Sequence, residues 1–275
     1  MFATLRNGRI ATALPSLFLL ALLSGDLSAQ VRGNRSAIDG EPPQRVMWVG
    51  HSFFYYNNSM HNHLGALIRA NDPKFPYRGT SVTISGAGID WHDMESYFRP
   101  NGILQYNIVQ EDNTLRFNKF EKLFDAVIIS DCSQCPIHPQ LKSVFHQYAR
   151  KQSEIVTANG ARPILFMTWA YKDKPEMTGE LAEQYTIAGN ENDALVIPAG
   201  LAFARAVAKR PDLEFYQPDR RHPTLIGTYL AACTTYAAVY GKSPAGNTYT
   251  AGIDPDTARF LQDTAEQAVR EYFAH

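Results

Sequence analysis

Short apolar runs alternate with segments of helical periodicity along most of the chain. The apolar runs predict five strands, at residues 46–49, 81–85, 125–130, 163–168 and 195–198. Apolar residues at helical spacing predict helices at residues 60–68, 141–156, 177–185, 201–208, 223–240 and 254–272. Because the strands are apolar throughout, helices are expected on both faces of the sheet. The pattern therefore predicts an α/β fold with a central parallel sheet.

Several residues with useful chemistry come directly after the predicted strands. Ser52, Gly86, Ser133 and Trp169 each lie within a few residues of a strand end. Parallel sheets bind their ligands beyond the carboxyl ends of the strands. We therefore expect these residues to gather at one edge of the sheet. The irregular residues 89–124 are expected to form an insertion beside that edge.

The first residues of the chain differ from the rest. Arg6 and Arg9 precede an apolar stretch of about 14 residues, and a small residue, Ala29, offers a cleavage point. This pattern predicts a secretory signal peptide at residues 1–29 and a secreted or periplasmic protein. A membrane anchor is the alternative, but the stretch is short for a bilayer span. Residues 30–44 are polar with Gly and Pro and predict a flexible leader, followed by one globular domain at residues 45–275.

Composition limits the classes of partner. The chain has 275 residues, 45% of them hydrophobic and 19% charged, and a net charge of −1, which is ordinary for a globular domain. Nucleic-acid binding usually needs a basic patch, and no clustered Lys/Arg segment is present. No nucleic-acid partner and no stable membrane anchor are therefore expected, which leaves a small molecule or a glycan as the expected partner.

Three cysteines remain after the predicted cleavage. Cys132 and Cys135 form a single CxxC pair, and Cys233 stands alone. In an oxidising compartment the pair can form a local disulfide, while the alternative is free cysteines packed in the core. A metal or redox role is disfavoured because no second CxxC or His pair accompanies the motif.

Ser52 is the candidate nucleophile. It lies two residues after a strand, where the chain is expected to turn into a helix. The N-terminus of a helix offers free N–H groups and a positive dipole end, which stabilise a developing oxyanion. The alternative is that Ser52 only caps the helix.

Asp219 and His222 are the candidate acid and base. A carboxylate three residues before a histidine, in a loop followed by Pro223, can reach the imidazole and fix its tautomer. The alternative is a solvated loop with an incidental histidine. Asp90 and Asp93 are rival acids, but nothing in the sequence links them to His222.

For Gly86, His61 and His63 the sequence gives weaker indications of a function. Gly86 follows a strand, and its backbone N–H can approach a ligand, although a plain loop glycine is the alternative. His61 and His63 are two residues apart, which does not match a helical metal pair. We therefore expect no metal site.

The order of these segments resembles the SGNH (GDSL-type) hydrolase superfamily, in its bacterial secreted branch. Gly50-His51-Ser52 resembles the first block of the family, and Ser85-Gly86-Ala87 resembles the second, whose glycine donates its N–H to the oxyanion. Residues 219–223 resemble the last block, with Asp219 as acid and His222 as base. The resemblance implies a three-layer α/β/α sandwich of the flavodoxin-like type and ester hydrolysis without a cofactor.

Two positions depart from the family pattern. His51 precedes the nucleophile where the family usually has Asp or Asn. The third block normally carries an Asn after a Gly, and residues 130–136 have neither. Gln134 falls near the Asn position, so its amide is the candidate third oxyanion donor, and Ser133 is the alternative.

The resemblance implies acyl transfer from an ester. Ser52 attacks the carbonyl while His222 takes its proton, and the N–H groups of Ser52 and Gly86 hold the oxyanion together with Gln134. A carbohydrate O-acetyl ester is the expected substrate because aromatic side chains crowd the inferred rim, with Tyr55, Trp169 and also His51 as candidate substrate-binding residues. Core packing of the same aromatics is the alternative. A lipid esterase, a thioesterase and a non-catalytic glycan-binding module are alternative functions.

Overall fold

A five-stranded parallel sheet forms the centre of the protein. The computed structural model describes residues 32–103 and 106–274, and the predicted signal peptide lies outside these residues. The strand order is β2-β1-β5-β6-β7, and every neighbouring pair is parallel. The strands are β1 (Arg45–Gly50), β2 (Arg78–Thr83), β5 (Ala126–Ile129), β6 (Arg162–Phe166) and β7 (Leu195–Ile197). All five correspond to the predicted runs, although β2 begins and ends earlier than expected.

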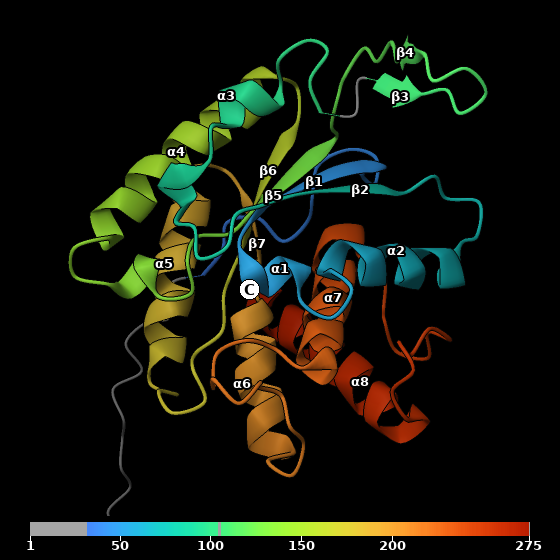
Figure 1. The fold of residues 1–275 in the computed structure, drawn as a ribbon. Helices are drawn as coiled ribbons and strands as arrows, with labels where there is room; N and C mark the ends of the chain where they lie inside the picture. The colour runs from blue at the N-terminus through green and yellow to red at the C-terminus, as the bar shows by residue number, and fades with distance from the viewer. Residues whose placement is uncertain (1–31, 104–105, 275) are drawn as a thin grey trace, which may run out of the picture. The chain divides into compact units, whose positions relative to one another are not determined.

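Helices cover both faces of this sheet, as Figure 1 shows. The helices are α1 (Ser52–Tyr55), α2 (Met60–Asn71), α3 (Met94–Tyr97), α4 (Lys142–Ala158), α5 (Met177–Glu191), α6 (Ala199–Lys209), α7 (Leu225–Tyr240) and α8 (Pro255–Phe273). Side chains alternate along each strand, so Val46 and Trp48 pack with α2, α6, α7 and α8. Met47 and Val49 pack on the opposite face with α3, α4 and α5. The three-layer α/β/α sandwich is therefore confirmed.

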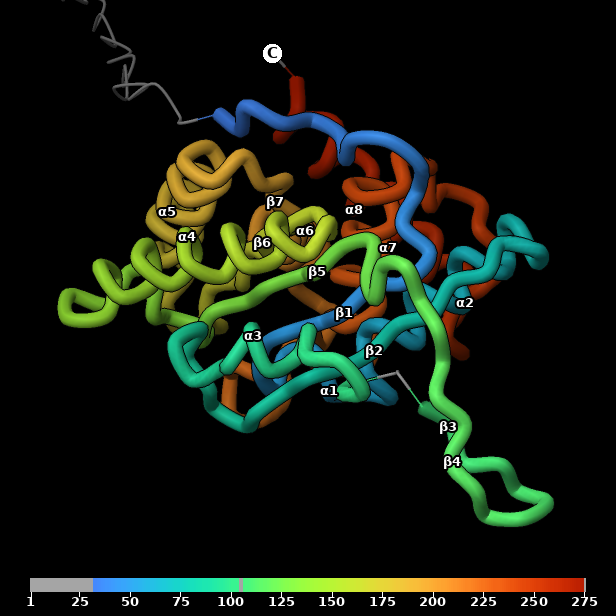
Figure 2. The backbone as a smooth tube through the Cα atoms, turned by 90° about the horizontal axis from the view of Figure 1, so that it is seen from above, coloured from blue at the N-terminus to red at the C-terminus, as the bar shows by residue number. Residues whose placement is uncertain are grey.

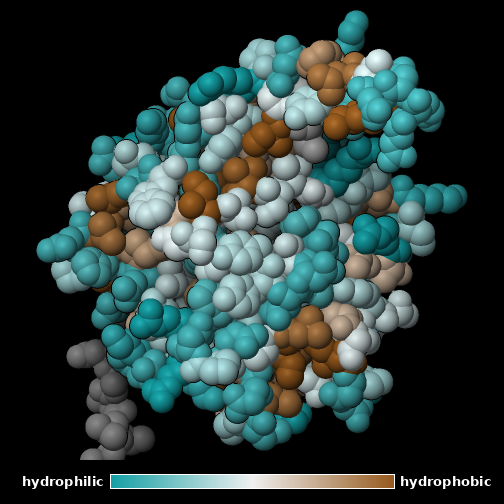
Figure 3. All heavy atoms as spheres, viewed as in Figure 1, coloured by the Kyte–Doolittle hydropathy of each residue, from teal (hydrophilic) through white to brown (hydrophobic). Residues whose placement is uncertain are grey.

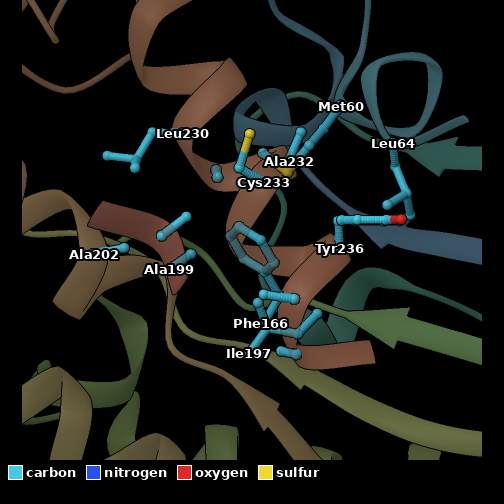
Figure 4. Packing of buried hydrophobic residues seen from close by; sticks show 14 of the residues in the cluster. Met60, Leu64, Phe166, Ile197, Ala199, Ala202, Leu230, Ala232, Cys233 and Tyr236 are labelled. Atoms are coloured by element: carbon cyan, nitrogen blue, oxygen red, sulfur yellow. The ribbon is translucent and has the colours of Figure 1, made fainter. Parts of the chain in front are cut away.

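Helix α7 lies at the centre of one helical layer. It is apolar on all sides, and every residue from Gly227 to Val239 is buried. Figure 4 shows Cys233 and Tyr236 of this helix packed near Met60 of α2 and Phe166 of β6. Cys233 is a free, buried cysteine. A Cβ on Gly227 would lie 2.5 Å from the Phe203 ring and 2.8 Å from the Phe215 carbonyl oxygen, so α7 packs closely at its start, next to the loop that carries His222.

Residues 89–124 contain little regular structure. They form a 3₁₀ turn (Ile89–Trp91), helix α3, and a two-stranded hairpin of β3 (Tyr106–Ile108) and β4 (Leu115–Phe117). Figures 1 and 2 show the hairpin standing out from the body at the end of the sheet where β5 begins. Figure 3 shows hydrophobic residues gathered in the same place, and Ile108 is 62% exposed. Only the first part of this predicted insertion lies at the carboxyl edge.

The segment predicted to be a flexible leader makes specific contacts where it is described. The amide N–H of Asn34 donates to Asn190 at 2.7 Å, and Arg35 pairs with Asp193 beyond the end of α5. Arg162 donates to the Glu41 carbonyl at 2.9 Å. Residues 32–44 are therefore tied to the domain that follows them.

Within the described residues, no helix combines the length and the apolar character needed to cross a membrane.

Candidate active site

Ser52 stands at the sharp turn between β1 and α1. Gly50 makes this turn possible, because a Cβ on Gly50 would lie 2.9 Å from the Phe54 ring and 3.2 Å from Cβ of Ser130. Ser52 is the first residue of α1 and is 6% exposed. Its Oγ therefore lies at the carboxyl edge of the sheet, partly shielded from water.

Three side chains form an unbroken hydrogen-bonded chain at this edge. Ser52 Oγ lies 2.7 Å from His222 Nε2, and His222 Nδ1 bonds to a carboxylate oxygen of Asp219. Because Nδ1–H donates to the carboxylate, Nε2 is left as the acceptor for the serine hydroxyl. The structure thus brings together the nucleophile, base and acid that the sequence predicted.

The Asp219 carboxylate is set up as an anion. Its second oxygen accepts the backbone N–H groups of Arg221 at 2.9 Å and His222 at 3.0 Å. Partial burial opposes ionisation, but the hydrogen bonds from His222 and these N–H groups outweigh it and lower the pKa of Asp219 to about 2. The base is therefore oriented by a group that stays charged through the ordinary pH range.

The loop that carries His222 is braced by its own backbone and by the nucleophile segment. Gln217 N–H donates to the His222 carbonyl at 2.8 Å, and Arg220 sits at a φ of 65°, in the left-handed region. Asn57, just past α1, donates to the Pro223 carbonyl at 2.9 Å. Asn57 was missed by sequence reasoning, because no local motif connects it to a residue so far along the chain.

Aromatic rings hold the imidazole in place. Tyr56 stacks on His222 with ring centroids 4.4 Å apart, and Phe53 meets the same ring edge-on at 5.7 Å. Trp169 is fully buried between Phe53 and Phe203, and its indole N–H donates to the Arg221 carbonyl at 3.0 Å. For Trp169 the structure therefore shows the core-packing alternative, with the ring supporting the base loop from beneath and not exposed to a substrate.

Aromatic surface does remain at the rim. Tyr55 is half-buried, and its hydroxyl donates to Ser85 Oγ at 3.1 Å. Trp91 follows the loop after β2 and is 61% exposed. These rings, unlike Trp169, have faces that a ligand can reach.

Gly86 occupies the turn after β2. Its φ of 70° lies in the left-handed region, while no atom within 4 Å would meet an added Cβ. The glycine is thus favoured by its backbone conformation and not by crowding. The bond between the neighbouring Ser85 and Tyr55 places this turn beside α1.

The loop after β5 carries Ser133 and Gln134, the two candidates for the third oxyanion donor. Cys132 and Cys135 are joined by a disulfide, so the pairing left open by the sequence is present. Ser133 Oγ lies 2.7 Å from the Tyr171 hydroxyl, and the side chain of Gln134 is exposed. Of the two candidate donors, Ser133 is already bonded to Tyr171, which leaves Gln134 as the donor candidate.

Asp131, which sequence reasoning also missed, is buried in this loop. One carboxyl oxygen accepts the N–H groups of Ile89 and Cys132, both at 2.7 Å. Burial raises the pKa of Asp131 to about 7, against the effect of these two N–H groups. The side chain therefore joins the loops that follow β2 and β5.

His51 is also buried, at 3% exposure, so it offers little surface to a substrate. Burial lowers the pKa of His51 to about 4, although a hydrogen bond to the Asp131 carbonyl opposes the change. Its Nε2 has no hydrogen-bond partner within the described residues. The ring thus packs as a neutral group between the nucleophile turn and the β5 loop.

One of the rival acids, Asp93, and one of the paired histidines, His63, have structural roles. Asp93 caps α3 by accepting the Ser96 N–H at 3.3 Å. His63 bridges the Asn57 carbonyl at 2.6 Å and the Tyr249 hydroxyl at 2.8 Å, which makes it part of the support under the site.

Comparison with known proteins identifies the fold. No protein-family model and no curated protein sequence matches the chain. A DUF4886 family protein from Bacteroides uniformis is similar with a TM-score of 0.57 and 18% identity, over 83% of this chain and 95% of that one. An acetylxylan esterase from Geobacillus stearothermophilus, solved as a catalytic mutant, is similar with a TM-score of 0.52 and 13% identity, over 73% and 96%. TesA is similar with a TM-score of 0.50 and 14% identity, over 70% and 96%. The chain therefore shares the fold of these proteins, which is the three-layer α/β/α fold that the resemblance predicted.

Proposed function

We propose that this protein is a serine esterase that cleaves carboxylic esters through an acyl-enzyme. The observation that carries the proposal is the continuous Ser52–His222–Asp219 hydrogen-bonded chain, with 2.7 Å between Ser52 Oγ and His222 Nε2. A serine hydroxyl in this position can lose its proton to His222 as it attacks a carbonyl. Asp219 then stabilises the imidazolium that forms.

The oxyanion is held by donors from three strand ends. The N–H groups of Ser52 and Gly86 supply two of them, and Gln134 supplies the third. His222 next protonates the leaving alcohol, and a water molecule activated by the same base releases the acid. No metal or other cofactor takes part in this scheme.

A carbohydrate O-acetyl group is the proposed substrate. The exposed faces of Trp91 and Tyr55 at the carboxyl edge suit a sugar ring. Catalytic mutants of the similar acetylxylan esterase replace a serine, a histidine and an aspartate. In that enzyme the aspartate stands three residues before the histidine, which is the spacing of Asp219 and His222. With its proposed signal peptide, the protein would act outside the cytoplasm.

The first experiment measures turnover of p-nitrophenyl acetate and of acetylated xylo-oligosaccharides. Wild type is compared with Ser52→Ala and with Ser143→Ala, a control on the exposed surface of α4. Hydrolysis by wild type and the control, and its loss in Ser52→Ala, is the expected result. A preference for long acyl chains would replace the carbohydrate substrate by a lipid ester. Glycan binding without turnover, unchanged by Ser52→Ala, would replace the esterase by a binding module.

A further inference from the structure

The loop that follows β5 lies among all the strand ends that build the site. Ser130 N–H donates to the Val49 carbonyl at 2.9 Å, which places the loop directly beside the nucleophile turn. Asp131 binds the Ile89 N–H from the β2 side at 2.7 Å. On the β6 side, Thr168 Oγ1 donates to the Ser133 carbonyl at 3.3 Å. A shift in this loop would therefore act on the reaction centre directly.

Within this loop, four of five successive residues are anchored through their side chains. Asp131 is bonded to two N–H groups, Cys132 and Cys135 to each other, and Ser133 to Tyr171. Cys135 N–H also donates to Cys132 Sγ at 3.1 Å. Gln134 alone has an exposed side chain, and it lies inside the ring that the disulfide closes. The loop is thus held by bonds on both sides of one exposed side chain, that of Gln134.

We propose that the Cys132–Cys135 disulfide is a positioning element for the oxyanion site. It holds the Ser133–Gln134 turn so that Gln134 can donate to the oxyanion formed at Ser52, and turnover therefore requires the oxidised pair. This inference rests on the proposed esterase function and deepens it.

Three features separate this role from general stabilisation. The disulfide closes a ring of only four residues, so its loss frees little chain in the unfolded state. Cys132 is half-buried and Cys135 is 6% exposed, and neither belongs to the two main clusters of buried apolar residues. The buried Asp131 and the Tyr171 hydroxyl still tether the loop when the S–S bond is broken. The fold is therefore expected to survive reduction, while the Ser133–Gln134 turn loses the support of the ring that the disulfide closes.

The test reduces the purified protein with dithiothreitol. Two electrons pass to the S–S bond, both cysteines become thiols, and dithiothreitol becomes a cyclic disulfide. We expect kcat for p-nitrophenyl acetate to fall about 10-fold or more while KM changes little, because an oxyanion donor acts in the transition state. Reoxidation should restore kcat. The double variant Cys132→Ala/Cys135→Ala should start at the low value and ignore dithiothreitol.

Controls separate this result from other outcomes. Cys233→Ala removes the third cysteine, which lies within α7, and should keep the wild-type response to the reductant. Gln134→Ala should lower kcat in the oxidised protein, and should add little to the loss in the disulfide-free variant, because both changes remove the same donor. Circular dichroism should show folded protein throughout.

Three results would overturn the inference and leave the esterase intact. They are equal kcat for the oxidised and reduced proteins, a loss of kcat that follows unfolding, and additive losses from Gln134→Ala and the disulfide-free variant. An oxidised wild-type protein without any turnover would instead refute the proposed function itself.

Discussion

The two halves of the candidate site are held together in different ways. One half, called the relay, consists of Ser52, His222 and Asp219, which bond to one another in a chain. The side chain of Asp219 is 46% exposed. On the oxyanion side, the candidate donors Gly86 and Gln134 make no such contact with each other. They are placed by what surrounds them, namely a left-handed turn, a disulfide and the buried carboxyl of Asp131.

This contrast explains which changes should abolish chemistry and which should only weaken it. The relay depends on the identity of three side chains, so a single replacement removes a function outright. The oxyanion side depends on the position of backbone and amide groups, so replacements there act through geometry. Variants on the two sides should therefore differ in size of effect and in pH dependence.

The largest expected effect comes from removing the nucleophile or the base. Ser52→Ala and His222→Ala should each lower kcat for p-nitrophenyl acetate by about 10⁴-fold or more, because each removes a group that bonds in the reaction. Combining the two replacements should cost little more than either alone, since the residues act as a unit. Additive losses would show that they do not form one relay.

A smaller loss is expected from Asp219→Asn. The asparagine keeps the shape but cannot hold the Nδ1–H tautomer of His222, so kcat should fall by about 10²- to 10⁴-fold. The matched control is Asp173→Asn, which removes the ion pair with Arg220 in the same region at 3.6 Å. An Asp219→Asn variant as active as this control would exclude Asp219 as the orienting acid.

Asp131→Asn tests the oxyanion side of the comparison through the pH dependence of the free energy of unfolding. The folded-state pKa of Asp131 is about 7, above its ordinary value, so wild type loses stability as the pH rises from about 4 to 7. Asparagine can accept the same two N–H groups without this loss. Relative to wild type, the variant should gain roughly 2–3 kcal/mol of unfolding free energy between pH 5 and pH 8. Urea unfolding at both pH values measures the difference. An equal change in unfolding free energy between the two pH values for wild type and variant would show that Asp131 is not buried as described.

His51→Asn should show the opposite pH dependence. The pKa of His51 is about 4, below its ordinary value, so wild type loses stability as the pH falls from about 6.5 to 4. The variant lacks that loss and should gain roughly 2 kcal/mol relative to wild type between pH 7 and pH 4.5. The same unfolding experiment measures it, and a gain at high pH instead would contradict the burial of a neutral imidazole.

The sequence was sufficient for the fold and for the three relay residues. Strands such as residues 125–130 are short and continuously apolar, and segments of helical periodicity lie between them. This alternation indicates an α/β sandwich. Ser52 follows a strand, and Asp219 and His222 are three residues apart, so local spacing made them candidates, and the resemblance to a known family joined them into one site. These features depend on neighbours within a few residues.

The supporting residues could not be found in the same way. Asn57, Asp131 and Tyr56 act on residues distant in the chain, and only the folded sheet brings them together. Trp169 is the type of residue expected at a sugar-binding rim, yet its ring stacks between Phe53 and Phe203. Whether an aromatic side chain after a strand faces solvent or the core is decided by tertiary packing, which no local pattern records.

The most direct test of the account is covalent labelling of the purified protein with a fluorophosphonate, followed by peptide mass mapping. A relay with an activated serine should give one adduct per chain, on Ser52, in wild type and in Ser143→Ala, and none in His222→Ala. Phosphonylation of another serine, or folded wild-type protein without any adduct, would contradict the claim that Ser52, His222 and Asp219 form a working nucleophilic centre.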